Sequence, residues 1–203
     1  AVMSGHGVAD GSRVVLYSQT TVQWATRVWW MLRAFGFDEA MVLNGGLTKW
    51  RQEDRPLSAE PANYPPARFT ARPRPELIAD KAAVLAALDD PDCLVLNSLS
   101  AEQHGGGGRN YGRPGRITGS VCVPAAALLD GPNGAYLPVD QLRAEFEASG
   151  AFDAPRVVTY CGGGIAASSD SFILTLFGHE GVSLYDGSLS EWVRDPALPM
   201  ETD

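Results

Sequence analysis

The stretch Val157-Val158-Thr159-Tyr160-Cys161-Gly162-Gly163-Gly164 decides how the fold of this chain is read. Its β-branched and aromatic residues predict a strand, and the three glycines that follow Cys161 predict a tight turn. The largely apolar residues 165–177 then predict a helix. The sequence therefore places a cysteine at the turn between a strand and a helix.

A thiol at such a turn lies close to unpaired backbone N–H groups and to the positive end of the helix dipole. Both favour the thiolate, which is the nucleophilic form of cysteine. The glycines allow a tight turn that brings several N–H groups toward a bound anion. An isolated cysteine at a strand end is usually a small buried apolar residue. Three successive glycines favour chemistry for Cys161 instead.

The same pattern occurs earlier in the chain. Residues 13–18 align with residues 156–161 at an offset of 143, and residues 42–50 align with residues 184–192 at an offset of 142. A long match with a single insertion or deletion indicates two copies of one domain. The first copy has Ser18 where the second has Cys161. It keeps the scaffold and lacks the thiol.

Strands that alternate with helices predict an α/β fold, in which helices cover both faces of a parallel sheet. We expect residues 1–54 to be the C-terminal half of a first, catalytically silent domain, residues 55–75 to be a proline-rich linker, and residues 76–203 to be the catalytic domain. The front half of the first copy is absent. The sequence thus predicts a fragment with exposed sheet edges and an exposed apolar face, or a half-domain that a partner chain completes.

Individual elements of the second copy can also be predicted. Apolar residues near helical spacing predict a helix from residue 77 to residue 88. A strand over residues 93–97 follows, then a loop to residue 119, a short strand over residues 121–123 and a helix over residues 139–148.

Composition excludes several classes of partner. A net charge of −8 and a pI near 4.8 argue against nucleic acid and anionic membranes. No apolar run approaches the roughly 18 residues that a bilayer span requires. Three cysteines are too few for a disulfide framework, so a reducing cytoplasm is expected. They do not form CxxC pairs with histidine partners, so no metal site is expected.

Three segments in order resemble the rhodanese-like sulfurtransferases, specifically the two-domain thiosulfate or 3-mercaptopyruvate type. The segment Gly115-Arg116-Ile117-Thr118-Gly119-Ser120-Val121-Cys122-Val123-Pro124 is similar to the family's Gly-His-Ile-Pro-Gly-Ala-x-Asn-x-Pro. The Cys161 loop and the segment Tyr185-Asp186-Gly187-Ser188-Leu189-Ser190-Glu191-Trp192 follow. The resemblance implies tandem rhodanese-like domains, each with a central parallel sheet flanked by helices, and an active site between them.

The resemblance also implies a reaction. Cys161 would take a sulfane sulfur from thiosulfate or 3-mercaptopyruvate, become a persulfide, and pass the sulfur to cyanide or a thiol. The N–H groups of the loop would hold the negative charge; its residues are Gly162, Gly163, Gly164, Ile165 and Ala166. The partners would be these small molecules alone, and no metal or organic cofactor is needed.

One departure from the family concerns the donor anion. Family members usually have Asp-x-Arg at the end of the second domain's first strand, and the arginine binds the donor anion. This chain has Asn97-Ser98-Leu99 there. The candidates to replace that arginine are Arg109, Arg113 and Arg116, which lie just past the glycine run of residues 105–108, and His104 directly before it. The uncharged Cys161 loop is closer to that of mercaptopyruvate enzymes.

Three other functions are compatible with parts of the sequence. Gly162-x-Gly164-x-x-Ala167 with Asp186 downstream satisfies the dinucleotide fingerprint, but it does not lie on the first strand of a domain. A phosphatase would need an arginine where Ala166 and Ala167 stand. The alternative that stays open is a non-catalytic rhodanese-like module that binds a partner, and persulfide formation on Cys161 separates it from an enzyme.

Overall fold

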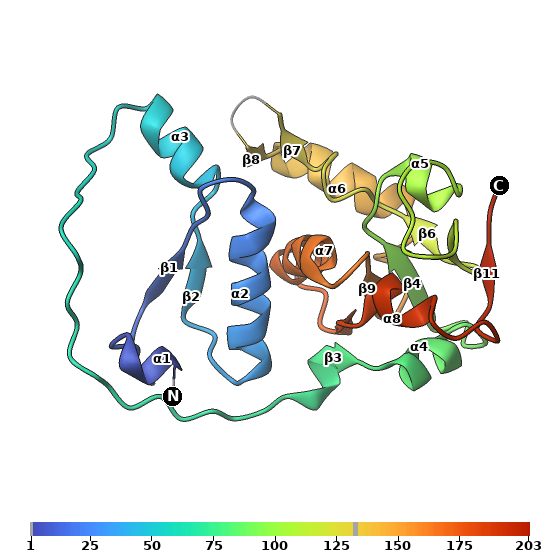
Figure 1. Ribbon diagram of the computed structural model, residues 1–203, viewed down its shortest axis with the longest axis horizontal. Helices are drawn as coiled ribbons and strands as arrows, with labels where there is room; N and C mark the ends of the chain where they lie inside the picture. Colours follow the sequence, from blue (N-terminus) through green and yellow to red (C-terminus); the bar gives the residue numbers. More distant parts are fainter. Residues whose placement is uncertain (1, 132–133) are drawn as a thin grey trace.

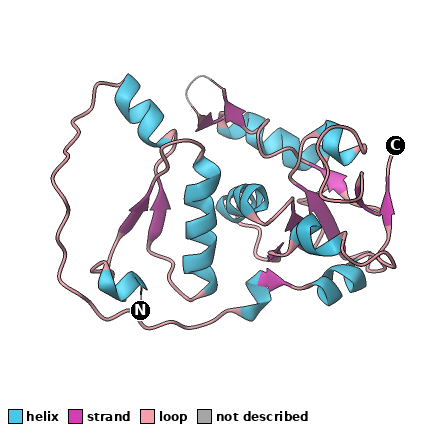
Figure 2. Ribbon diagram, viewed as in Figure 1, coloured by secondary structure: helices cyan, strands magenta, loops and turns pink. Residues whose placement is uncertain are grey.

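The computed structural model describes residues 2–131 and 134–203 of the chain. Two groups of helices and strands are joined by a long extended segment that runs along the left edge of the molecule in Figure 1. The elements of the N-terminal group lie within residues 2–52, and those of the C-terminal group begin at residue 75. Strands and helices alternate along the chain, as the predicted α/β class requires (Figure 2).

The C-terminal group is built on a five-stranded sheet with the order β3-β10-β9-β4-β6. Every neighbouring pair in it is parallel. Its strands are β3 (Ile78–Ala79), β4 (Cys93–Asn97), β6 (Val121–Cys122), β9 (Arg156–Tyr160) and β10 (Val182–Tyr185). Residues 157–160 of the central strand β9 are all buried, as expected for a parallel sheet covered on both faces.

Helices and short strand pairs surround this sheet. The helices are α4 (Lys81–Ala87), α5 (Ala101–His104), α6 (Val139–Ala148), α7 (Ile165–Leu176) and α8 (Ser188–Trp192). Two antiparallel pairs lie outside the sheet, β5 (Arg116–Ile117) with β11 (Met200–Glu201) and β7 (Leu129–Asp130) with β8 (Ala135–Tyr136). Among these elements α7 lies nearest the N-terminal group (Figure 1).

The N-terminal group contains one parallel pair of strands, β1 (Val14–Leu16) and β2 (Ala40–Val42). Its helices are α1 (Val2–Gly5), α2 (Val22–Ala34) and α3 (Gly46–Gln52). The order β1, α2, β2, α3 is the same as the order β9, α7, β10, α8, and α2 packs against α7. This contact joins the two groups.

One face of the β1–β2 pair is apolar and open. Val15, Tyr17 and Met41 are 54%, 58% and 51% exposed although they lie in or beside strands. A groove of about 470 Å³ runs over this face, and Trp50 and Leu57 contribute to its lining. This part of the β1–β2 pair is therefore an exposed apolar surface.

The segment from residue 55 to residue 74 contains no helix or strand, as its prolines predict. Its end is anchored to α2, because the N–H groups of Arg72 and Arg74 donate to the carbonyl oxygens of Phe35 and Ala34. Arg74 also forms a bidentate ion pair with Asp38, with N–O distances of 2.7 and 2.6 Å.

The predicted strand over residues 93–97 and helix over residues 139–148 are confirmed. Two expectations are wrong. The predicted helix does not begin at residue 77, because Leu77 ends a 3-10 helix, η1 (Pro75–Leu77), and strand β3 follows it. Helix α4 begins only at Lys81, where the Asp80 carboxylate caps it by accepting from Ala83 N at 2.8 Å. The predicted loop to residue 119 also contains α5 and β5, since the Ser100 hydroxyl caps α5.

None of the helices in the described part of the chain is long and apolar enough to cross a membrane.

Candidate active site

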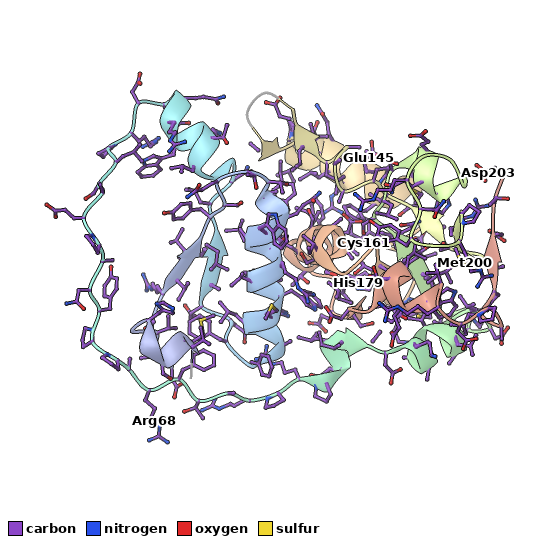
Figure 3. The ribbon with its side chains drawn as sticks, in the orientation of Figure 1. Arg68, Glu145, Cys161, His179, Met200 and Asp203 are labelled. Atoms are coloured by element: carbon purple, nitrogen blue, oxygen red, sulfur yellow. The ribbon has the colours of Figure 1, made fainter. Side chains whose placement is uncertain are left out.

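Cys161 lies at the point where β9 ends, four residues before α7 begins. Its residue is 3% exposed, and Figure 3 shows it in the interior of the molecule beside α7. Gly162 and Gly164 are buried, whereas Gly163 is exposed. The loop after the cysteine therefore reaches solvent at its tip.

Ser188 fixes the two ends of this loop. Its buried Oγ accepts hydrogen bonds from the N–H groups of Cys161 and Gly164, both at 3.1 Å. The same hydroxyl donates to the carbonyl oxygen of Tyr185 at 2.8 Å. Ser188 and Gly164 have positive φ values of 49° and 76°, so both turns depend on unusual backbone conformations.

The loop carbonyls are bound to α8. Leu189 N donates to the carbonyl oxygen of Cys161 at 3.0 Å. Ser190 donates to the carbonyl oxygen of Gly162 from its backbone N at 2.9 Å and from its hydroxyl at 2.5 Å. Within the described residues, the N–H groups of Gly162 and Gly163 donate no hydrogen bond. These donors lie next to Cys161 and are available to an anion.

The N-terminal group repeats one of these contacts. Leu47 N donates to the carbonyl oxygen of Ser18 at 3.0 Å, as Leu189 N donates to that of Cys161. Ser18 thus takes the backbone position of Cys161. The helix that follows is capped differently, because Thr21 accepts from Gln23 N through its side chain, whereas Gly164 has no side chain with which to cap α7.

A cation from the N-terminal group lies against the loop. Arg27 on α2 forms an ion pair with Asp186, which directly follows β10. A β-carbon at Gly164 would lie 3.0 Å from Nη1 of Arg27. The arginine side chain is 20% exposed. Sequence reasoning missed Arg27, because nothing local connects a helix residue with a loop more than a hundred residues away.

Tyr111 lies against the same loop at Gly162. A β-carbon at Gly162 would lie 2.0 Å from both Cζ and Oη of Tyr111. Burial raises the pKa of the Tyr111 phenol, and the charge of Cys161 raises it further. Gly162 is therefore required for space. Sequence reasoning missed Tyr111 too, since the loop that carries it has no regular pattern.

Two of the predicted anion-binding residues are bound to the C-terminal segment. Arg113 donates through Nη1 to the carbonyl oxygens of Asp195 and Leu198, at 3.2 and 3.0 Å. Arg116 pairs with Glu201 at 2.9 Å and with Asp203 at 2.6 Å. Asp203 lies at the right-hand edge of the molecule, away from Cys161 (Figure 3).

The other two predicted anion-binding residues, His104 and Arg109, differ in whether their side chains have a protein partner. His104 Nδ1 lies 3.1 Å from Asn97 Nδ2, and burial, then Arg116, lowers the pKa of the imidazole. Arg109 is exposed, and its guanidinium has no hydrogen bond or ion pair within the described residues. The charge of Arg109 acts on Tyr111. Of the four predicted residues, Arg109 is the one whose guanidinium has no partner among the described residues, and its charge reaches Tyr111.

Leu99, which stands where family members usually have an arginine, is part of the core. Leu99 is only 9% exposed, and its N–H donates to Oδ1 of Asn97 at 3.0 Å. The Cys122 thiol donates to the carbonyl oxygen of Leu99 at 3.4 Å. Burial raises the pKa of Cys122 to about 11 and also raises that of Cys93, so both favour the thiol.

The chain matches the model of the rhodanese-like domain over residues 4–53 and 80–195. It is 31% identical to the 3-mercaptopyruvate sulfurtransferase of Escherichia coli, over 96% of this chain and 70% of that protein. It is 30% identical to the mitochondrial thiosulfate/3-mercaptopyruvate sulfurtransferase 1 of Arabidopsis thaliana, over 98% of this chain and 59% of that protein.

Among solved structures, a complex of EanB with ergothioneine superposes with a TM-score of 0.85 at 24% identity. The superposition covers 98% of this chain and 53% of that one, so the chain spans about half the length of EanB. This likeness shows a shared fold. The domain match and the relatives at about 30% identity show that the chain belongs to the rhodanese-like family.

Proposed function

We propose that this chain is a sulfurtransferase that moves a sulfane sulfur from thiosulfate or 3-mercaptopyruvate to a thiol or cyanide through a persulfide on Cys161. The observation that carries the proposal is the loop after Cys161. Its carbonyls are bound to α8, and the N–H groups of Gly162 and Gly163 donate to no other described residue. Such a loop suits a negatively charged sulfur.

The first half-reaction transfers sulfur to the enzyme. The Cys161 thiolate attacks the outer sulfur of the donor, and a new S–S bond forms. The bond between that sulfur and the rest of the donor breaks, and the rest departs with the electron pair. Thiosulfate leaves as sulfite, and 3-mercaptopyruvate leaves as the enolate of pyruvate.

The second half-reaction restores the enzyme. A thiolate or cyanide attacks the outer sulfur of the persulfide, and Cys161 departs as thiolate. The N–H groups of the loop, including those of Ile165 and Ala166 in the first turn of α7, stabilise the charged sulfur between the two steps. Gly164 gives its own N–H to Ser188 and so holds the loop in shape.

The domain assignment follows the same proposal. Residues 76–203 form the catalytic domain, residues 55–75 the linker, and residues 1–54 the C-terminal half of a silent domain. The shared backbone contact of Ser18 and Cys161 supports the repeat. The silent part contributes to the site through Arg27, whose guanidinium lies against Gly164.

The donor anion needs a cation because Leu99 replaces the family arginine. Arg27 and Arg109 are the arginines that the observations favour, since Arg27 lies against the loop and Arg109 is free of protein partners within the described residues. Arg113, Arg116 and His104 support the loop that carries Tyr111.

The proposed chemistry implies that the partners are small molecules. The net charge of −8 argues against nucleic acid and membranes as partners. The three cysteines are free thiols. A cytoplasmic location, proposed from cysteine usage, stays a prediction.

The presence of Leu99 in place of the family arginine also favours a second candidate function. In it, the chain is a rhodanese-like module that binds a partner without turnover. A turnover assay tests the choice. The purified protein is supplied with each donor and cyanide, and thiocyanate is measured beside a Cys161→Ser control. Thiocyanate formation that the control lacks supports the enzyme. Its absence with both donors supports the binding module.

A further inference from the structure

The hydroxyl of Tyr111 lies against the loop that follows the candidate nucleophile and has no partner among the described residues. Its ring packs against Gly162, the residue after Cys161, so closely that a β-carbon there would overlap the phenol oxygen. Within the described residues the hydroxyl forms no hydrogen bond. A partly buried hydroxyl without a partner loses hydrogen bonds that it had in water, unless a ligand supplies them.

The other buried or half-buried tyrosines have such partners. The hydroxyl of Tyr136 lies 2.7 Å from Ser169 Oγ, and that of Tyr185 donates to Glu191 Oε2 at 2.7 Å. The hydroxyl of Tyr160 lies 2.8 Å from Ser120 Oγ and accepts from Ile117 N. Tyr111 differs from all three, and it is the one that touches the Cys161 loop.

The two donors differ in what their departing group needs. Sulfite is a stable dianion and needs no proton to leave. The enolate from 3-mercaptopyruvate has to gain a proton on carbon to become pyruvate. A neutral phenol in hydrogen-bond reach of the departing group can supply that proton, which is the role of a general acid.

We propose that Tyr111 is a catalytic residue that donates a proton to the enolate leaving group and so favours donors whose sulfur is attached to carbon. The inference rests on the proposed function of Cys161. It assigns a role that thiosulfate would not require.

The protons balance within one turnover. The Cys161 thiolate attacks the thiol sulfur of 3-mercaptopyruvate, the S–S bond forms and the C–S bond breaks. The persulfide first carries the proton of the donor thiol. Tyr111 gives its own proton to the enolate carbon, and the phenolate takes the proton from the persulfide. The products are pyruvate and an anionic persulfide, with no other reactant consumed.

Electrostatics supports the direction of transfer. Burial, then the negative charge of Cys161, raises the pKa of Tyr111 above its usual value of 10.0. The phenol is therefore protonated throughout the neutral range and can act as an acid. Activity that depends on this proton is present below the raised pKa and is lost as the pH rises through it.

The test uses Tyr111→Phe in the purified full-length protein, which removes the hydroxyl and keeps the ring against Gly162. Pyruvate release from 3-mercaptopyruvate is followed in a single turnover and is expected to fall about 100-fold. Sulfur uptake from thiosulfate and alkylation of Cys161 by iodoacetamide need no proton and are expected to stay unchanged. Tyr64→Phe, at an exposed tyrosine in the extended segment, is the matched control.

The outcomes separate this inference from the proposed function. Tyr111→Phe with wild-type pyruvate release overturns the role of Tyr111 alone, and so does an equal loss in the alkylation reaction. A wild-type protein that takes sulfur from neither donor refutes the function of Cys161 as well. The loss of the alkaline limb of the pH profile in Tyr111→Phe would support a proton donor over a structural role.

Discussion

Thr26 and Ser168 meet across the contact between α2 and α7, with their hydroxyl oxygens 3.1 Å apart. They are separated by 142 residues, which is the offset that relates residues 42–50 of the first copy to residues 184–192 of the second. Equivalent positions of the two copies therefore lie face to face. Both side chains are small and buried, so the helices approach closely and bring Arg27 to the Cys161 loop.

A large side chain in this contact should separate the two groups. We expect Ser168→Leu to lower the free energy of unfolding by about 1–3 kcal/mol because it overpacks the contact. Thr26→Val nearly keeps the shape and removes two hydrogen bonds, to Ser168 Oγ and to the carbonyl oxygen of Gln23, each worth about 1 kcal/mol. Urea unfolding of both variants measures the difference. A Ser168→Leu variant as stable as the unaltered protein would contradict a close helix contact.

Gly162 should tolerate no side chain while Tyr111 is present. Gly162→Ala places a methyl group 2.0 Å from the phenol, and we expect it to lower the free energy of unfolding by about 1–3 kcal/mol. The double variant with Tyr111→Ala removes the clash and should recover much of that stability without recovering pyruvate release. If the double variant stays as unstable as Gly162→Ala, the contact is not the cause.

Arg27 should bind the donor anion rather than act on the chemical step. We expect Arg27→Gln to raise KM for both donors about 10-fold, the loss of roughly one charged hydrogen bond, with little change in kcat. Steady-state kinetics with each donor measures it. Arg33→Gln is the control, since Arg33 lies on the same helix and pairs with Asp38. An unchanged KM in Arg27→Gln would assign the anion to Arg109.

Asp170 should make stability depend on pH. It lies fully buried in α7, and burial, opposed more weakly by the Ser98 hydroxyl, raises the pKa of its carboxyl well above the usual 3.8. The folded protein keeps a proton that the unfolded chain releases above that value, so stability falls as the pH rises from about 4 toward the raised pKa. Asp170→Asn should lose this slope, which urea unfolding at pH 5 and pH 7.5 reveals. The same slope in both proteins would show that Asp170 is ionised when folded.

Much of the fold could be predicted from the sequence, because it follows from local pattern. The strand before Cys161, the turn and the helix α7 are encoded in adjacent residues, and so is the repeat that relates Ser18 to Cys161. The start of the C-terminal group was mistaken for helix since Leu77 and Ile78 fit helical spacing, whereas Asp80 caps a later start.

The surroundings of the thiol could not be predicted, because they depend on contacts between distant segments. Arg27 and Tyr111 reach the loop from other parts of the chain, and Ser188 holds both ends of the loop from beyond β10. The choice of Arg113 and Arg116 followed charge alone. Their hydrogen bonds to the C-terminal segment have no signature in sequence.

The most direct test of the account is the intact mass of the purified protein after exposure to thiosulfate or 3-mercaptopyruvate. We predict a gain of one sulfur atom that cyanide removes and that Cys161→Ser abolishes. Cys122→Ser and Cys93→Ser should keep the gain, since burial raises the pKa of both thiols. No gain with either donor, or a gain that persists in Cys161→Ser, would contradict a persulfide on Cys161.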